Sequence, residues 1–196
     1  KYYSKTWIKI MKIYYSKFKG LKVFTGKNHF DNRGAFRELF IKNKTFNFNG
    51  VFWCMSKSKK NVVRGLHIQS KVNQAKYISV VKGKIFDVAL DLRRNSKTFG
   101  KYFTIVLSEK NAKSIYIPKG FAHGFMGMDK ENYVVYGNSN YRSKNDEVGI
   151  LWNDKKLKIK WPSKKPIISK KDKNNLTFED FCKINFNKNF LYEKKQ

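Results

Sequence analysis

The stretch that decides the fold is Lys76-Tyr77-Ile78-Ser79-Val80-Val81-Lys82-Gly83-Lys84-Ile85-Phe86-Asp87-Val88-Ala89-Leu90-Asp91. Two runs rich in β-branched and aromatic residues flank the Lys82-Gly83 pair, a pattern typical of two strands joined by a tight hairpin turn. The second run is mostly apolar, so we expect the carboxylate of Asp87 to have a specific role there.

Similar short runs continue on both sides of this segment, separated by turn residues, and helical periodicity is scarce before the C-terminal part. This pattern predicts an all-β fold, and many short strands in one domain favour a jelly roll or a related barrel. One helix is expected over 177–184, where Thr177 and Asp180 approximate a capping box. The expected strands are Leu21–Thr25, Ala35–Phe40, Val51–Ser56, Val62–Gln69, Lys76–Val81, Lys84–Leu92, Tyr102–Ser108, Ser114–Ile117 and Tyr133–Tyr141.

The composition indicates a single folded domain. The 196 residues are 41% hydrophobic and 16% aromatic, and both fractions exceed those of a disordered basic chain. Only three prolines occur, and no Gly/Ser-rich linker divides the chain. We expect one domain over residues 12–172, an N-terminal extension over 1–11 and a polar helical tail over 173–196. No apolar stretch reaches the length of a membrane span, and the two separated cysteines suit free thiols in the reducing cytoplasm.

The formal charge of +29 raises the possibility of nucleic-acid binding. The lysines are scattered along the chain as in the product of an AT-rich genome, and no zinc finger, helix-turn-helix or aromatic RNA-binding motif accompanies them. Nucleic acid is therefore not the expected partner. A basic surface would also attract a small anionic substrate such as a sugar diphosphate.

Histidine is rare, so the placement of His67 and His123 is informative. His67 lies in the alternating strand Arg64-Gly65-Leu66-His67-Ile68-Gln69, and His123 lies in a Pro-x-Gly-x-x-His spacing that resembles the second motif of cupins. The paired histidines and glutamate of the first cupin metal motif are missing. Two histidines do not supply the three or four ligands of a zinc or iron site, so we expect no metal and no cofactor.

A longer series of motifs resembles the dTDP-4-keto-6-deoxyglucose (dTDP-4-dehydrorhamnose) 3,5-epimerase family in its order along the chain. The resemblance implies a cupin-type jelly-roll barrel over residues 12–172 with short C-terminal helices. It also implies a homodimer and a cytoplasmic epimerase that acts on a nucleotide diphosphate sugar for surface polysaccharide synthesis. The matching segments are Phe30–Glu38, Val63–His67, Gln74–Lys76, Gly83–Val88, Asp91–Arg93, Ser96–Gly100, Ile117–Phe125, Trp152–Asp154 and Trp161-Pro162.

The family's reaction implies four catalytic positions. A ketone at sugar carbon 4 acidifies the protons on carbons 3 and 5, so epimerisation needs a base, an acid on the opposite face and a group that stabilises the enolate. By resemblance His67 is the base, because imidazole titrates near neutral pH, and Asp172 orients it. Lys76 then stabilises the enolate, and Tyr136 returns the proton.

Eight further residues are expected to line the substrate site. Arg33 and Arg64 suit the diphosphate and ribose end, because guanidinium groups bind phosphate with two donors, and Asp87 is placed to orient His123. The eight are Arg33, Glu38, Arg64, Asp87, His123, Tyr141, Arg142 and Glu147.

The base-binding end departs from the family pattern. Phe52 and Cys54 occupy the places of a Gln-x-Asn pair, and Arg142, beside Tyr141, occupies the place of a thymine-stacking tyrosine. These changes favour GDP over dTDP as the carrier, and they leave open a hexose or a heptose. Other readings are epimerisation at carbon 3 alone, a related ketoisomerase, a cupin-like binding protein without turnover, and a basic β-barrel that binds nucleic acid.

Overall fold

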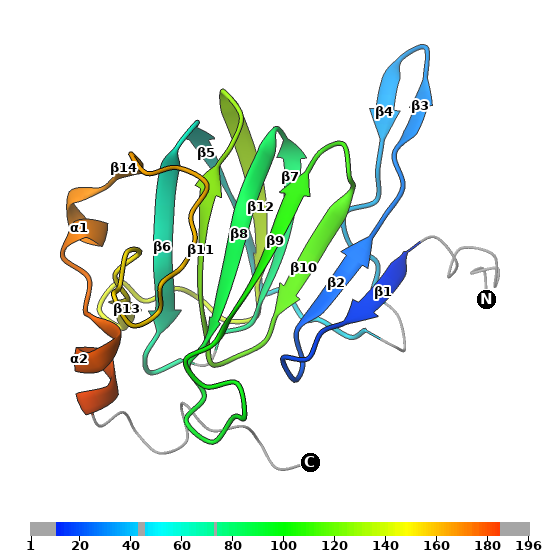
Figure 1. Cartoon of the computed structure of the whole chain (residues 1–196). Coiled ribbons are helices and arrows are strands. Elements are labelled where there is room, and N and C mark those ends of the chain that lie inside the picture. The colour runs from blue at the N-terminus through cyan, green and yellow to red at the C-terminus, as the bar shows by residue number, and fades with distance from the viewer. Residues whose placement is uncertain (1–10, 43–45, 73, 185–196) are drawn as a thin grey trace.

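The computed structural model describes residues 11–42, 46–72 and 74–184, and most of its regular structure is β-strand. Two sheets face each other to form a barrel (Figure 1), as the sequence predicted. The first sheet has the order β1 (Lys12–Tyr15), β2 (Lys22–Thr25), β10 (Lys113–Ile117), β7 (Lys76–Lys82), β12 (Glu131–Asn138), β5 (Phe52–Lys59). The second has the order β13 (Glu147–Gly149), β6 (Val62–Gln69), β11 (Phe121–Gly127), β8 (Lys84–Asp91), β9 (Tyr102–Ser108), with β14 (Ile167–Ile168) paired to β6.

The segment Lys76–Asp91 forms two strands, but the predicted hairpin is wrong. β7 belongs to the first sheet and β8 to the second, so the chain crosses between the sheets at Gly83. Gly83 has φ +79°, and a Cβ there would lie 2.1 Å from the carbonyl oxygen of Glu131, so the corner accepts only glycine. The crossing lets Ile78 of β7 and Ile85 of β8 enter one core from opposite sides.

Three hydrophobic clusters hold the layers together. The first fills the space between the sheets and the other two cover their outer faces. Because β8 is buried on both faces, it places Ala89 in the first cluster and Val88 and Leu90 in the second, which explains why its sequence lacks a polar alternation. An aromatic group including Phe24, Phe46 and Tyr77 covers the first sheet.

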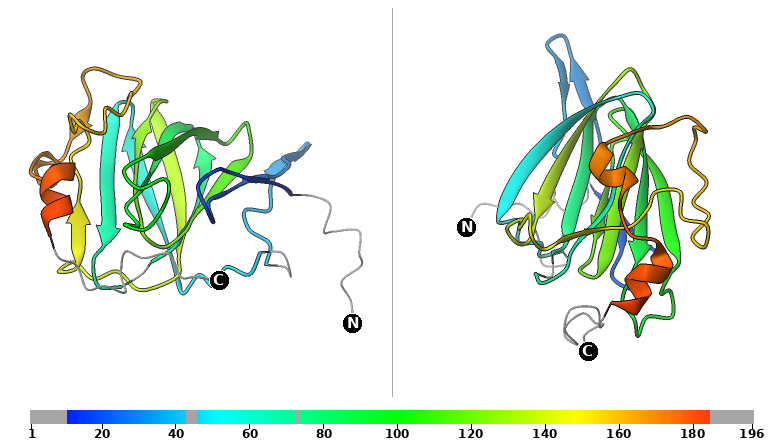
Figure 2. Two further views of the ribbon diagram at one scale, coloured as in Figure 1. Left: turned by 60° about the horizontal axis from the view of Figure 1, so that its bottom comes forward. Right: turned by 90° about the vertical axis from the view of Figure 1, so that its left-hand side faces the viewer.

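The helices lie beside the second sheet (Figure 2). Of the expected short C-terminal helices, α1 (Lys170–Lys173) was not located from the sequence, whereas α2 (Phe178–Lys183) falls within the predicted helix 177–184. The Thr177 hydroxyl accepts a hydrogen bond from the Asp180 backbone N–H at 3.0 Å. Phe181 of α2 is fully buried in the second cluster, so this part of the expected polar tail packs on the barrel. The domain boundaries at 12 and 172 stay a prediction, and residues 1–10 and 185–196 lie outside the described part of the chain.

Other strand predictions also differ from the structure, since β1, β13, β14 and residues 29–31 form strands that were not expected. The expected strand Ala35–Phe40 ends at Phe36, because beyond it the Arg37 guanidinium donates to the carbonyl of Glu109 and the Phe40 ring packs on Tyr77. β11 was not expected as a strand, yet all seven of its residues are buried.

A two-stranded hairpin of β3 (His29–Asp31) and β4 (Gly34–Phe36) projects away from the barrel (Figures 1 and 2). Its Phe30 and Phe36 side chains are 76% and 66% exposed, an unusual state for large aromatic residues. Among the described helices, none is long and apolar enough to cross a membrane.

Candidate active site

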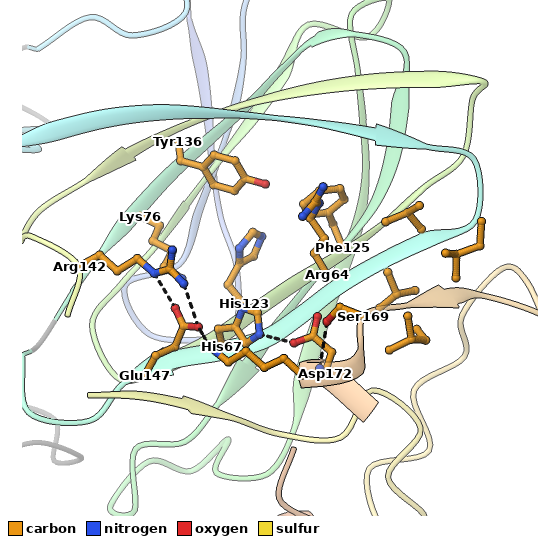
Figure 3. Close-up of a pocket in the computed structure, with 15 residues that line it drawn as sticks. Arg64, His67, Lys76, His123, Phe125, Tyr136, Arg142, Glu147, Ser169 and Asp172 are labelled. Carbon is orange, nitrogen blue, oxygen red and sulfur yellow. Dashed lines mark hydrogen bonds and ion pairs between the residues drawn. The ribbon is translucent and has the colours of Figure 1, made fainter. Parts of the chain in front are cut away.

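A cavity of about 510 Å³ opens between the two sheets, and a smaller one of about 190 Å³ adjoins it. Both are lined by His67, Lys76, Tyr136, Arg142 and Glu147, so these five residues lie where the cavities meet. Figure 3 shows most of these side chains converging on one space from both sheets. The other residues lining the larger cavity are Val62, Val63, Arg64, His123, Phe125, Ile167, Ile168, Ser169, Lys171 and Asp172.

An irregularity in β6 brings Arg64 and His67 to the same cavity. Residues three positions apart on a regular strand point to opposite faces. Here the pairing between β6 and β11 shifts register between His123 and Phe125, opposite this part of β6. Gly65 at the shift has φ +111°, and a Cβ there would lie 2.6 Å from the Gly124 backbone, so the close approach requires glycine.

His67 and Asp172 form a hydrogen-bonded pair, with His67 Nε2 and Asp172 Oδ1 2.6 Å apart (Figure 3). Asp172 is held on α1 by Ser169, whose hydroxyl accepts from the Asp172 backbone N–H at 3.0 Å. Burial alone would raise the pKa of Asp172, but the hydrogen bond and charge of His67 outweigh it and hold the pKa below its ordinary value. The carboxylate therefore stays ionised and leaves Nδ1 of His67 as the nitrogen available to take a proton.

Tyr136 faces the cavity from the opposite sheet (Figure 3). Its hydroxyl is 2.8 Å from the Ser56 hydroxyl on the neighbouring strand β5, and its ring packs edge-on against His123 at 6.2 Å. Burial raises the pKa of Tyr136 well above its ordinary value. The phenol thus remains protonated and can act as a proton donor.

Lys76, on β7 of the same sheet as Tyr136, points its amine into the space shared by both cavities. Burial of the ammonium group lowers the pKa of Lys76 to about 8, against the opposing attraction of Glu147. Lys76 therefore carries its charge at neutral pH and loses it in mildly alkaline solution.

A second histidine–carboxylate pair lies deeper in the barrel. His123 Nε2 is 2.8 Å from Asp87 Oδ2, and the two residues are 5% and 0% exposed. Asp87 does not line the cavity but contacts the back of His123, as the sequence predicted for an orienting carboxylate. Asp87 Oδ1 is the buried side-chain atom without a hydrogen-bond partner in the described part of the chain.

Positive charge predominates around the cavity mouth. Glu147 is held by the Arg142 guanidinium, at 2.9 and 3.2 Å, and by the Lys171 ammonium group on α1. Burial would raise the pKa of Glu147, but these two cations lower it to about 2. Arg64 is anchored on β5 by Ser58, whose hydroxyl accepts from Nε at 2.9 Å.

The structure brings together eight of the twelve predicted site residues around the cavities. Asp87 contacts one of these eight from behind, whereas Arg33, Glu38 and Tyr141 do not line the described cavities. The Arg33 side chain is 85% exposed on the projecting hairpin and pairs with Asp31. Tyr141 is 73% exposed and stacks on Phe52 of the smaller cavity, with ring centroids 6.0 Å apart.

Several contributing residues were not predicted from the sequence. Ser56 was detectable, because it follows Phe52 and Cys54 at alternate positions of one strand and so points to the same side. Lys171 and Ser169 gave no signal in a short lysine-rich segment. Among the described residues no group of three or more His, Cys, Asp or Glu side chains is arranged to hold a metal ion, and the absence of a cofactor stays a prediction.

Comparison with known proteins identifies the family. The sequence model of the family described as dTDP-4-dehydrorhamnose 3,5-epimerase matches residues 15–180. The chain belongs to this epimerase family. It is 42% identical over 165 residues to the dTDP-4-dehydrorhamnose 3,5-epimerase of Shigella flexneri, covering 81% of this chain and 91% of that protein, and 40% identical over 152 residues to that of Methanothermobacter thermautotrophicus, covering 74% and 82%.

Solved structures of family members have the same fold. The Legionella pneumophila epimerase in complex with dTDP-4-keto-L-rhamnose aligns with a TM-score of 0.85 and 32% identity, over 95% of this chain and all of that one. The dTDP-4-dehydrorhamnose 3,5-epimerase of Elizabethkingia anophelis aligns with a TM-score of 0.80 and 36% identity, over 87% of this chain and 97% of that one. The cupin-type jelly roll and the epimerase assignment predicted from the sequence are confirmed.

Proposed function

We propose that this chain inverts carbons 3 and 5 of a 4-keto-6-deoxy nucleotide sugar, with His67 as the base and Tyr136 as the acid. The observation that carries the proposal is their placement on opposite sheets, on either side of one cavity. Inversion requires removal of a proton from one face of the sugar and delivery to the other, which two groups across a cavity accomplish.

The pair of His67 and Asp172 suits the first half of the reaction. Because Asp172 engages Nε2, Nδ1 takes the proton from carbon 3 or carbon 5, and the ionised carboxylate stabilises the resulting imidazolium. Tyr136, kept protonated by burial, then donates to the opposite face of the enolate.

Lys76 and His123 support the proposed enolate. Negative charge develops on the oxygen at carbon 4, and a donor already fixed in a site that excludes water stabilises it at no cost of reorganisation. Lys76 lies where the two cavities meet, and His123, which is hydrogen-bonded to Asp87, lines the larger cavity. Arg64 and Lys171 then remain for the diphosphate.

The carrier nucleotide is proposed to be thymidine diphosphate, as in the names of the relatives of 34–43% identity. The stacked rings of Tyr141 and Phe52 offer an aromatic surface for a base beside the smaller cavity. Arg142 at the same end favours GDP as the second candidate, since guanidinium pairs with the guanine edge. Calorimetry with dTDP, GDP and UDP distinguishes the candidate carriers, and tighter binding of GDP than of dTDP would make GDP the carrier.

A homodimer is proposed to complete the site. Arg33 and Glu38 lie outside the chain's own cavity, on and after a hairpin that projects with exposed Phe30 and Phe36. A second copy that received this hairpin would bury both aromatic rings and supply a further guanidinium to the diphosphate. Sedimentation at micromolar concentration tests this, and a monomer alone would contradict it.

The proposed setting is the cytoplasm, where sugar nucleotides for surface polysaccharides are made. Cys54 and Cys182 are free thiols, which suits a reducing compartment.

The decisive experiment is incubation with dTDP-4-keto-6-deoxyglucose in deuterium oxide, followed by proton NMR. We expect deuterium and inverted configuration at both carbons 3 and 5. Inversion at carbon 3 alone would make the enzyme an epimerase of carbon 3 only. Nucleotide-sugar binding without deuterium uptake would instead indicate a cupin-like binding protein without turnover. His67→Asn is the matched control, because it should bind nucleotide but exchange at neither carbon.

A further inference from the structure

A third cavity, of about 380 Å³, is formed by the chain between β13 and β14 and shares no lining residue with the two catalytic cavities. Its rim packs on the outer face of the second sheet, where the Trp161 ring meets Phe86 at 5.9 Å. The volume falls within the range of small-molecule sites. The lining residues are Trp152, Asn153, Asp154, Lys158, Ile159, Lys160, Trp161, Ser163 and Lys164.

The frame of this cavity is fixed by hydrogen bonds. Asp154 Oδ1 accepts from the backbone N–H groups of Lys156 and Leu157, at 2.8 and 2.9 Å, and Oδ2 accepts from that of Phe178 at 2.8 Å. The Trp161 indole N–H donates to the Trp152 carbonyl at 2.7 Å. The acidic residue of the lining is thus 6% exposed and committed to the loop, so it does not oppose a bound anion.

Positive charge is concentrated at the same place. Lys158, Lys160 and Lys164 are exposed, and none has an acidic partner among the residues that the structure describes. Five of the 13 residues from 152 to 164 are lysines, whereas lysine and arginine together number 43 in the whole chain of 196. The enrichment is local, so the general lysine content of the protein does not account for it.

The backbone at Lys158 supports a specific role. Lys158 has φ +50°, a conformation that is uncommon for residues other than glycine and that concentrates at ligand sites. Its backbone is held on both sides, because its N–H donates to the Asp154 carbonyl at 3.0 Å and its own carbonyl accepts from the Tyr102 hydroxyl at 3.2 Å. The Lys158 side chain therefore projects from a backbone position that these two hydrogen bonds hold in place at the cavity rim.

We propose that this cavity is an accessory binding site for a nucleoside diphosphate. Indole rings stack on planar bases, and three ammonium groups without acidic partners bind the phosphates by charge-assisted hydrogen bonds. Substrate and product of an epimerase of this family both carry a nucleoside diphosphate, and the site holds such a molecule outside the barrel. Binding here is independent of turnover, so its test does not depend on the catalytic assignment.

The test counts bound dTDP per chain by equilibrium dialysis of the full chain at physiological salt. The variant Lys158→Gln/Lys160→Gln/Lys164→Gln should bind about one dTDP fewer than wild type, because each lost phosphate contact weakens binding roughly tenfold. Its rate of deuterium incorporation from substrate should equal that of wild type. The matched control Lys97→Gln/Lys110→Gln/Lys130→Gln removes the same charge from exposed positions outside the cavities, and it should bind as wild type does.

Three results would overturn the proposal. The first is an unchanged dTDP count in the cavity variant, and the second is an equal loss in the control, which would reduce the effect to overall charge. The third comes from competition: inorganic diphosphate that displaces the variant-sensitive dTDP as well as dTDP itself would show that the indoles take no part.

Discussion

Replacement of Tyr136 by phenylalanine separates proton removal from inversion. The ring contacts with His123 and Phe125, at centroid distances of 6.2 and 6.4 Å, are retained, and the change deletes the hydroxyl and its 2.8 Å hydrogen bond to Ser56. The fold should survive, since one hydrogen bond contributes roughly 0.5–1.5 kcal/mol to stability. His67 and Asp172 lie on the other side of the cavity and are untouched.

The expected magnitude follows from the role of the lost group. A positioned general acid contributes roughly a hundred- to ten-thousandfold to rate, which is about 3–5 kcal/mol of barrier. The yield of inverted product should therefore fall by at least about a hundredfold in Tyr136→Phe. Exchange of the carbon 3 and carbon 5 protons with solvent should continue within several-fold of wild type, because His67 can remove a proton and return it to the same face.

The assay is proton NMR in deuterium oxide, which records loss of the proton signal and change of configuration in one sample. Ser56→Ala is the matched control, because it removes the partner of the hydroxyl and leaves the phenol in place; it should invert within about tenfold of wild type. Normal inversion by Tyr136→Phe would refute the reasoning and transfer the acid role to water or to another side chain.

Three other outcomes are expected. Asp172→Asn should lower exchange at both carbons at least about a hundredfold, since the neutral amide neither stabilises the imidazolium nor fixes its tautomer, whereas exchange near the wild-type rate by NMR would remove Asp172 from the mechanism. The kcat/KM of wild type should fall as pH rises through about 8, where Lys76 loses its proton. Lys76→Met should be roughly a hundredfold slower at pH 7 and should not show this decrease at alkaline pH. The same decrease in the variant would point to another titrating group. Phe181→Ala should reduce the free energy of unfolding by roughly 3–5 kcal/mol in urea titrations, and a loss below about 1 kcal/mol would mean that α2 is a dispensable tail.

The sequence predicted the β-rich architecture because β-branched runs and turn residues are local signals. It did not distinguish a hairpin from a corner at Gly83, since both place a glycine between two apolar runs and differ only in which partners the strands find. β11 escaped detection for a related reason: a strand buried throughout has no alternation to reveal it.

The site shows the same division between local and distant information. His67 and Tyr136 sit on predicted strands, so their inward direction followed from alternation and from family motifs. Asp172 lies 105 positions after its partner and depends on a four-residue helix that the Ser169 cap establishes. The places of Arg33 and Glu38 depend on a hairpin that leaves the barrel, and no pattern within one chain specifies where such a hairpin binds.

The position of Asp172 on α1 means that the proposed catalytic pair with His67 is completed late in synthesis of the chain. Synthesis up to residue 149 delivers every strand of both sheets except β14, together with His67, Lys76 and Tyr136. Asp172, the proposed partner of the base, is added only 23 residues later, near the end of the lysine-rich segment. A product of premature termination between residues 150 and 171 therefore contains His67 but lacks Asp172, the carboxylate hydrogen-bonded to it. Such a fragment also lacks Phe181 of α2, which is fully buried in the second cluster, so a chain shortened in this way loses part of its core together with the partner of His67.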